Sequence, residues 1–180
     1  MKIFINALKV LLVLLLGLLL IAFLLPKQYE VQRSVVINTP PSAVFEQVAD
    51  FNNYLKWNVW SKMDGNAKNI ITGIPKTVGS AWQWEGKEIG QGGLTIKKIV
   101  PNEMIEYELM FVKPMQTTAK EVWTFEAINE GKTKVTWTDT GDLSFPVNRF
   151  MGLFIDKMLG GQFAEGLQNL KILCEQPIKE

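Results

Sequence analysis

The sequence contains no histidine, which removes the commonest general base and the commonest metal ligand found in proteins. It contains one cysteine, Cys174, so an internal disulfide and a cysteine-based zinc site are both excluded. Its 19 basic and 18 acidic residues leave a net charge of +1 and form no basic stripe, which argues against nucleic acid as a partner. We therefore expect no metal site and no cofactor.

A long apolar run lies near the N-terminus of the 180-residue chain. Every residue of 10–25 is apolar or glycine, and with the residues before it the run reaches the roughly 20 residues that span a bilayer core. The competing interpretation is a cleaved secretory signal, which needs a small-residue cleavage site that residues 21–27 do not offer. We expect residues 1–26 to be an uncleaved single-pass membrane anchor and residues 27–180 to form one domain.

The charges that flank this run barely favour either orientation in the membrane. Lys2 and Lys9 precede it, while Lys27 and Arg33 follow it, so the positive-inside rule is close to a tie. A short basic tail ahead of a long C-terminal domain resembles an export signal that was never cut. We therefore expect the domain on the extracytoplasmic (periplasmic) side of the membrane.

The remaining sequence predicts an α+β domain. Asn38 to Ser42 indicates a helix start, capped by Thr39 or Ser42 and ending near Asp50. A second short helix or turn follows over residues 51–60. The β-rich runs, separated by Gly, Pro and Asn, are residues 29–37, 81–85, 93–100, 104–111, 117–127 and 132–140. Apolar residues at helical spacing predict a long helix over 146–175, in which Gly160-Gly161 allows a kink or a close approach to the sheet.

The last hairpin can be registered from its sequence. Asn129-Glu130-Gly131 suits a three-residue loop with glycine in the left-handed conformation, and Ile128 then faces Lys132. This register pairs Phe125 with Val135, Trp123 with Trp137 and Glu121 with Asp139 on one face of the sheet. Aromatic and aliphatic cross-strand pairs predict that this face is the inner one.

Several segments of the domain resemble a known family. They are residues 34–45 (SVVINTPPSAVF), 55–60 (LKWNVW), 79–86 (GSAWQWEG) and 163–171 (FAEGLQNLK). In this order they resemble the polyketide cyclase/dehydrase branch of the START-like, or SRPBCC, superfamily over about residues 29–176. The resemblance implies a helix-grip fold, in which a curved antiparallel sheet wraps around a long C-terminal helix and encloses a hydrophobic cavity. Members of the superfamily bind lipids, sterols, hormones or quinones, and some are cyclases or hydroxylating enzymes, so no single activity is implied.

Large apolar side chains are the main candidates for lining a ligand pocket. Six tryptophans in a domain of this size exceed what packing alone requires, although each one taken singly is better explained as core. The residues that we expect to bind ligand are Trp57, Trp82, Trp84, Tyr107, Trp123, Trp137, Phe150, Phe154 and Met158.

Glu121 and Asp139 form the one constellation suited to acid–base chemistry. If both face inward, the repulsion between them raises the pKa of one carboxyl, which then serves as an acid, a base or a hydrogen-bonding group. The alternative is that both lie in water at the mouth of the sheet or pair with Lys113, Lys120 or Arg149.

The function that we expect is membrane-anchored binding of a hydrophobic small molecule, lipid or isoprenoid-like, between the sheet and the C-terminal helix. One alternative is a cyclase or dehydratase that uses Glu121 and Asp139. Another is a scaffold whose pocket is filled by tryptophan.

Overall fold

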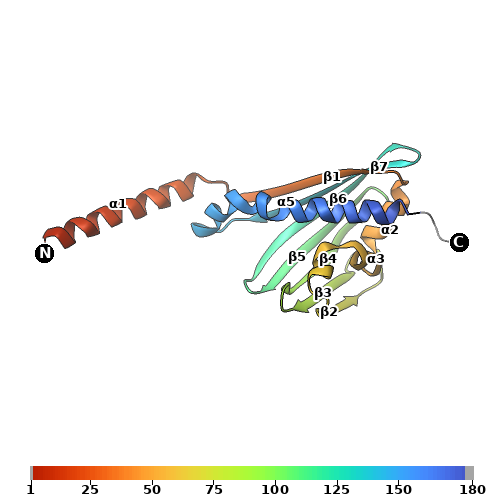
Figure 1. The fold of residues 1–180 in the computed structure, drawn as a ribbon, viewed down its shortest axis with the longest axis horizontal. Coiled ribbons are helices and arrows are strands. Elements are labelled where there is room, and N and C mark those ends of the chain that lie inside the picture. The colour runs from red at the N-terminus through yellow and green to blue at the C-terminus, as the bar shows by residue number, and fades with distance from the viewer. Residues whose placement is uncertain (1, 177–180) are drawn as a thin grey trace.

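The computed structural model describes residues 2–176. A seven-stranded antiparallel sheet curves around one long C-terminal helix, and a separate helix projects from the N-terminal end (Figure 1). This arrangement confirms the α+β helix-grip fold predicted above. The helices are α1 (Lys2–Leu24), α2 (Pro41–Ala49), α3 (Phe51–Trp57), α4 (Val59–Met63) and α5 (Val147–Cys174). The strands are β1 (Gln28–Ile37), β2 (Lys68–Thr72), β3 (Ala81–Gly86), β4 (Gly90–Val100), β5 (Met104–Lys113), β6 (Thr117–Asn129) and β7 (Lys132–Asp142).

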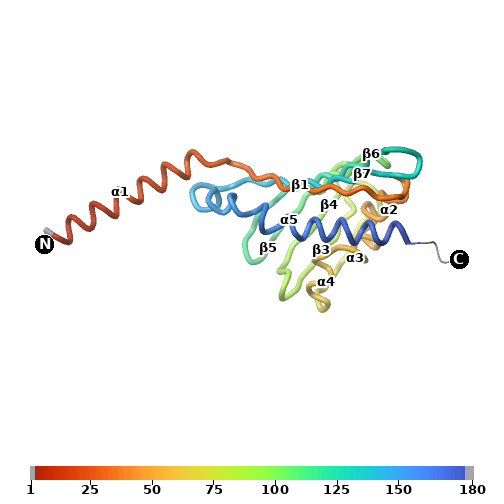
Figure 2. Tube along the Cα trace, turned by 45° about the horizontal axis from the view of Figure 1, so that its top comes forward, coloured from red at the N-terminus to blue at the C-terminus, as the bar shows by residue number. Residues whose placement is uncertain are grey.

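The strands follow the order β1-β7-β6-β5-β4-β3-β2, so the first strand closes one edge beside the last. Figure 2 shows α5 running alongside β1 and across the inner face of the sheet. The short helix α2 contacts β6, β7 and α5, and α3 and α4 also contact α5. Sequence patterns predicted every strand except β2. That five-residue edge strand is largely exposed and begins with Lys68 and Asn69, so it carries no alternating apolar pattern.

The hairpin of β6 and β7 has the register predicted from its sequence. Glu121 pairs with Asp139, Trp123 with Trp137, and Phe125 with Val135. The predicted loop was wrong in detail, because Asn129 rather than Ile128 faces Lys132 and the register shifts between Ala127 and Asn129. Gly131 also lies outside the left-handed region. The bulge at residue 128 takes up the extra residue, which shortens the turn without changing the pairs further along the strands.

The helix α5 is continuous through Gly160-Gly161, and of the two glycines only Gly160 lies in a close contact. A Cβ added at Gly160 would collide with the guanidinium of Arg33 on β1. Arg33 crosses the helix at this point and forms an ion pair of 2.8 Å with Asp156. Further along, Phe163 stacks on Trp137 with ring centroids 4.0 Å apart. Gly160 therefore leaves room for the Arg33 guanidinium against α5, and the aromatic pair joins the helix to the sheet.

The starts of the short helices differ partly from prediction. Pro40 is the N-cap residue of α2 and no side chain caps this helix, so the expected Thr39 or Ser42 cap was wrong. The Thr39 hydroxyl instead donates to the Cys174 carbonyl at 3.0 Å. The Asp50 carboxylate accepts from the Asn52 N–H at the start of α3, which satisfies one of the free N–H groups of that helix.

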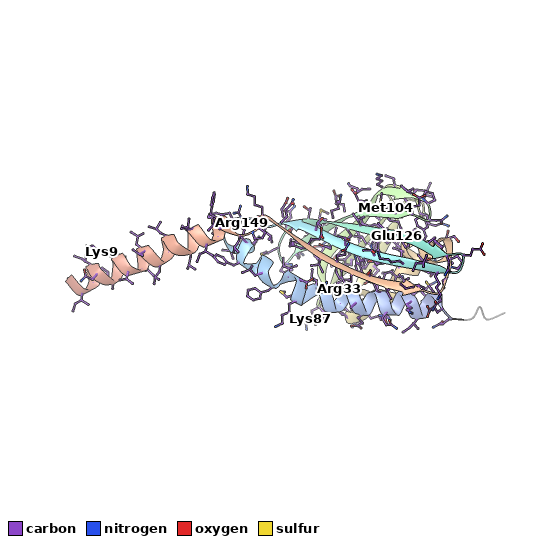
Figure 3. All side chains as sticks on the ribbon, turned by 90° about the horizontal axis from the view of Figure 1, so that it is seen from above. Lys9, Arg33, Lys87, Met104, Glu126 and Arg149 are labelled. Carbon is purple, nitrogen blue, oxygen red and sulfur yellow. The ribbon has the colours of Figure 1, made fainter. Side chains whose placement is uncertain are left out.

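The helix α1 includes a 22-residue apolar stretch, Ile3–Leu24, with mean hydropathy 2.9 and nearly all of its side chains exposed. It extends away from the domain (Figure 1). Arg149 lies at the junction between α1 and α5 (Figure 3), where its Nη1 donates to the carbonyls of Ala22 and Phe23 at 3.1 and 3.2 Å. A cation at this position satisfies carbonyls that the helix leaves free and faces the negative end of the helix dipole.

Candidate ligand cavity

A cavity of about 140 Å³ lies between the inner face of the sheet and the helices α3, α4 and α5. Its walls are mainly aromatic and aliphatic, and every strand except β2 contributes to them. The lining residues are Tyr29, Tyr54, Asn58, Trp60, Trp82, Trp84, Ile89, Leu94, Leu109, Phe111, Glu121, Asp139, Leu159 and Phe163. Only four of the fourteen lie on the β6–β7 hairpin or α5, so the cavity extends mainly toward β3, β4 and β5.

The aromatic wall on β3 depends on a glycine in the neighbouring strand. Trp82 and Trp84 lie in contact with ring centroids 4.7 Å apart. A Cβ on Gly92 of β4 would collide with the indole of Trp84 and with the Met110 carbonyl. A glycine at this strand position therefore leaves the space into which the Trp84 ring settles.

Two carboxyl groups face each other within this cavity. Glu121 and Asp139 are directly paired across β6 and β7 and are only 5% and 2% exposed. Glu121 Oε2 accepts from the indole N–H of Trp137 at 3.1 Å and from that of Trp123 at 3.4 Å. Asp139 Oδ1 is buried and has no hydrogen-bond partner among the described residues. The pair therefore faces inward, as the hairpin register predicted, and no Lys or Arg is among the residues that line the cavity.

Burial raises the pKa values of both carboxyls, by different amounts. Desolvation and, to a smaller extent, the nearby charge of Asp139 raise the pKa of Glu121 to about 8, against the lowering effect of the two indole N–H groups. Desolvation also raises the pKa of Asp139 to about 6, although the neighbouring Tyr29 hydroxyl offsets part of that rise. At neutral pH the pair therefore holds about one proton and about one negative charge between the two carboxyls.

Some of the other polar groups of the cavity wall are paired within the protein. The indole N–H of Trp82 donates to Asn69 Oδ1 at 2.8 Å, and that of Trp84 donates to the Ile89 carbonyl at 3.3 Å. Asn58 Oδ1 accepts from the Ser61 N–H and so caps α4. The Nδ2 of Asn58 is buried and, like Asp139 Oδ1, has no partner among the described residues.

The family model described as "Polyketide cyclase / dehydrase and lipid transport" matches residues 28–175. The chain belongs to this family. The match begins at the first residue of β1 and ends just after α5, so the family domain contains the whole sheet and cavity and omits α1. No curated protein matches the chain by sequence.

Several solved structures share the family fold. The Zhui aromatase/cyclase from a Streptomyces species has a TM-score of 0.63 and 13% identity, with 84% of this chain and 96% of that chain covered. Protein CV1439 from Chromobacterium violaceum has a TM-score of 0.61 and 16% identity, with 82% and 98% covered. A protein from Thermobifida fusca, solved by NMR, has a TM-score of 0.60 and 21% identity, with 79% and 90% covered. At these identities the similarity establishes the fold alone.

In the structure the nine predicted ligand-binding residues lie in three places. Trp82 and Trp84 line the cavity. Four others, Trp57, Tyr107, Trp123 and Trp137, are fully buried and pack around it without forming its wall. The last three, Phe150, Phe154 and Met158, lie on the first half of α5 outside the cavity, and Phe154 is 59% exposed. The structure therefore brings two of the nine to the cavity surface.

Sequence reasoning missed most of the cavity wall. Leu94, Leu109 and Phe111 share the inner face of their strands, and the alternation of apolar and polar residues in β5 was a signal for the last two. Tyr29 and Asn58 carried no such signal, because one follows the apolar run and the other lies between two short helices. Their places in the wall depend on how β1 and α4 pack in three dimensions.

Proposed function

We propose that this protein is a membrane-anchored member of its family that binds a small hydrophobic molecule in the cavity between the sheet and α5. The observation that carries this proposal is the cavity itself, which has aromatic walls and two buried carboxyl groups at one side. A mostly apolar cavity with a few converging polar groups is the usual form of a small-molecule site. The family description, which includes lipid transport, supports the same class of ligand.

The cavity volume limits what enters it. About 140 Å³ is close to the roughly 150 Å³ of an engineered apolar cavity that binds benzene, and it is below the roughly 300–1,000 Å³ of typical ligand pockets. One ring or one or two isoprene units fit inside. A longer lipid would keep the rest of its chain outside the cavity, beside the exposed apolar residues of the first half of α5.

The membrane part of the proposal rests on α1 and on the start of α5. A groove of about 350 Å³ between these helices is lined entirely by apolar residues, among them Leu15 and Leu19 of α1 and Phe150 and Phe154 of α5. Val147 and other apolar residues on this part of α5 are also exposed. An apolar surface continuous with a membrane-spanning helix is stable at the level where hydrocarbon meets headgroups. We place the domain on the extracytoplasmic side because the N-terminal segment is similar to an uncut export signal.

The decisive experiment is native mass spectrometry of the full chain released from lipid nanodiscs, followed by extraction and identification of any molecule that it carries. We expect a single class of hydrophobic small molecule at substoichiometric or full occupancy. If the protein carries no such mass, and if no lipid-like probe changes its tryptophan emission, the scaffold with a filled pocket becomes the better account.

A second candidate function is acid–base catalysis of a cyclisation or dehydration. The separated pKa values of Glu121 and Asp139 favour it, because such a pair supplies a protonated acid and an ionised base near neutral pH. If the reaction is a dehydration, replacement of the pair by glutamine and asparagine would change the carried molecule to one that is heavier by one water. An unchanged molecule in the variant supports binding without catalysis.

A further inference from the structure

Arg149 carries a positive charge that the protein only partly balances. Its Nη1 donates to the carbonyls of Ala22 and Phe23 at the end of α1, and its guanidinium lies over the ring of Phe145, 5.3 Å from the ring centroid. Carbonyl oxygens and an aromatic face offer partial negative charges and no full one. Of the guanidinium atoms that lack a partner in the described part of the chain, Nε is buried and Nη2 is not.

No carboxylate of the described residues forms an ion pair with Arg149. The two acids nearest to it in the sequence are both bound elsewhere. Asp142 accepts from the Gln28 amide at 2.9 Å, and Asp156 pairs with Arg33 at 2.8 Å. The side chain of Arg149 is also half-buried, so water compensates its charge less well than at an open surface. An anion from outside the chain would complete this position.

The position of Arg149 relative to α1 indicates where that anion comes from. The apolar stretch of α1 ends at Leu24, and the carbonyls that Arg149 binds belong to the last turn of this stretch (Figure 3). In a bilayer spanned by α1, the end of the apolar stretch lies at the level of the lipid headgroups. The anions present at that level are lipid phosphates.

The apolar groove of about 350 Å³ between α1 and α5 lies next to this cation. On α1 it is lined by Leu15, Leu18 and Leu19, which precede Ala22 by three to seven residues and so lie roughly 5–10 Å deeper in the bilayer at 1.5 Å per residue. On α5 it includes Phe150, the residue after Arg149. The cation at headgroup level and the groove on its hydrocarbon side follow the order of the phosphate and acyl chain of a phospholipid.

We propose that the junction of α1 and α5 binds an anionic phospholipid of the surrounding membrane, with its phosphate beside Arg149 Nη2 and one acyl chain in the apolar groove. This inference rests on the membrane part of the proposed function and concerns a site separate from the cavity. A guanidinium matches the geometry of a phosphate, and basic positions between membrane helices bind anionic headgroups. A neutral lipid would fill the groove and leave the charge of Arg149 without a counter-ion.

The test is native mass spectrometry of the full chain released from nanodiscs that contain equal amounts of dioleoyl phosphatidylglycerol and dioleoyl phosphatidylcholine. Both lipids have a phosphate and the same acyl chains, and only phosphatidylglycerol carries a net negative charge. We expect the wild-type chain to retain phosphatidylglycerol in preference to phosphatidylcholine by at least about fivefold. High salt should weaken this preference only slightly, because a half-buried pair is screened less than an exposed one.

Arg149→Gln removes the charge and keeps an amide donor for the carbonyls of α1, so it should lower the retained ratio of the two lipids to that of the nanodisc. Arg149→Lys restores the charge and should restore the preference. Lys157→Gln is the matched control, since Lys157 is an exposed cation on the same helix, and it should behave as wild type.

The groove is tested by filling it. Met151→Trp, on the α5 wall of the groove, should lower the retention of both lipids. Leu153→Trp places the same ring on an exposed position of α5 outside the groove and should retain lipid as wild type does. Leu159→Trp narrows the separate cavity and should leave phospholipid retention unchanged.

The other outcomes contradict defined parts of the proposal. Equal retention of the two lipids by the wild-type chain overturns the headgroup site, and a preference that survives Arg149→Gln assigns it to other cations. Loss of phospholipid in Leu159→Trp would place the lipid in the cavity and overturn the groove site. If a hydrophobic small molecule is carried while no phospholipid is retained, the inference fails and the proposed ligand binding stands. If carbonate washing releases the chain from membranes, the inference fails together with the membrane part of the proposed function.

Discussion

Trp137 of β7 and Phe163 of α5 stack with their ring planes 5° apart and their centroids 4.0 Å apart. The same indole lies against Trp123 on its other side, at 4.4 Å between centroids, and bonds Glu121 through its N–H. One stack of rings therefore joins the C-terminal helix to the hairpin that carries the carboxyl pair. The position of Asp139 in the cavity depends on this join between helix and sheet.

We predict that Phe163→Ala destabilises the domain by about 3–5 kcal/mol, because it removes a fully buried aromatic ring and leaves a cavity next to Trp137. Urea unfolding of the full chain in detergent, followed by tryptophan emission, measures this loss. Phe154→Ala on the same helix is the control, since Phe154 is mostly exposed in the domain and its loss should change stability by less than about 0.5 kcal/mol.

The second prediction concerns the pH dependence of stability. Folding raises the pKa of Glu121 from 4.5 to about 8 and that of Asp139 from 3.8 to about 6. Only below about pH 3 are both carboxyls protonated in the folded and the unfolded chain alike. As the pH rises toward 8, the unfolded chain releases protons that the folded domain retains, so the free energy of unfolding falls; above about pH 8 it levels off.

Thermal unfolding between pH 4 and pH 9 checks this dependence in the full chain. The double variant Glu121→Gln, Asp139→Asn should melt at higher temperature than wild type at pH 7 and show a flatter profile. The side-chain carbonyl of the introduced glutamine retains the bonds from the two indoles. Glu130→Gln, in the exposed turn between β6 and β7, should behave as wild type. A wild-type melting temperature that does not change with pH would place the carboxyl pair in contact with water.

The register of the carboxyl pair followed from local sequence because alternation sets the face of a strand and the turn sets its partner. The error at Ile128 remained harmless, because the bulge lies between the turn and the buried pairs. The long helix could also be predicted from the sequence, since its apolar spacing extends over many turns. Edge strand β2 could not be predicted, because its pairing with β3 depends on hydrogen bonds and not on a buried face.

The cavity wall was far less predictable than the fold. Trp123 and Trp84 have similar sequence surroundings in β-strands. Trp123 is nevertheless enclosed by Trp57 and Trp137, while Trp84 faces the cavity. That difference is set by which rings from other elements arrive beside each tryptophan, and no pattern within one strand encodes it. The number of tryptophans indicated a site without indicating its position.

The third prediction is that the mature protein keeps α1. Residues 21–27 hold no small-residue cleavage pattern, and Arg149 bonds the carbonyls of Ala22 and Phe23 at the end of the helix. N-terminal sequencing of protein extracted from membranes should therefore begin at residue 1 or 2, and carbonate washing should not release it. A start near Lys27 together with release into the wash would contradict the anchor.

The fourth prediction is that the start of α5 touches the acyl chains. In a Cys174→Ser background, a spin label at Phe154→Cys should be accessible to oxygen and shielded from a water-soluble nickel reagent in nanodiscs. A label at Ile172→Cys, which is exposed at the far end of α5, should show the reverse. Equal exposure of both labels to the nickel reagent would place all of α5 in water and restrict membrane contact to α1.

The last prediction separates the cavity from the rest of the core. Leu159 of α5 is a half-buried residue of the cavity wall, and it lies one residue before the close contact of Gly160 with Arg33. Leu159→Trp should fill most of the space of about 140 Å³ and abolish the carriage of ligand, while the core around Trp57 and Trp123 stays intact. Native mass spectrometry measures the carried ligand, and thermal unfolding shows whether the fold is kept. Lys157→Trp, on an exposed position of the same helix, should carry ligand as wild type does. If the filled variant still carries the molecule, the ligand lies outside this cavity, and the groove between α1 and α5 becomes the site to probe next.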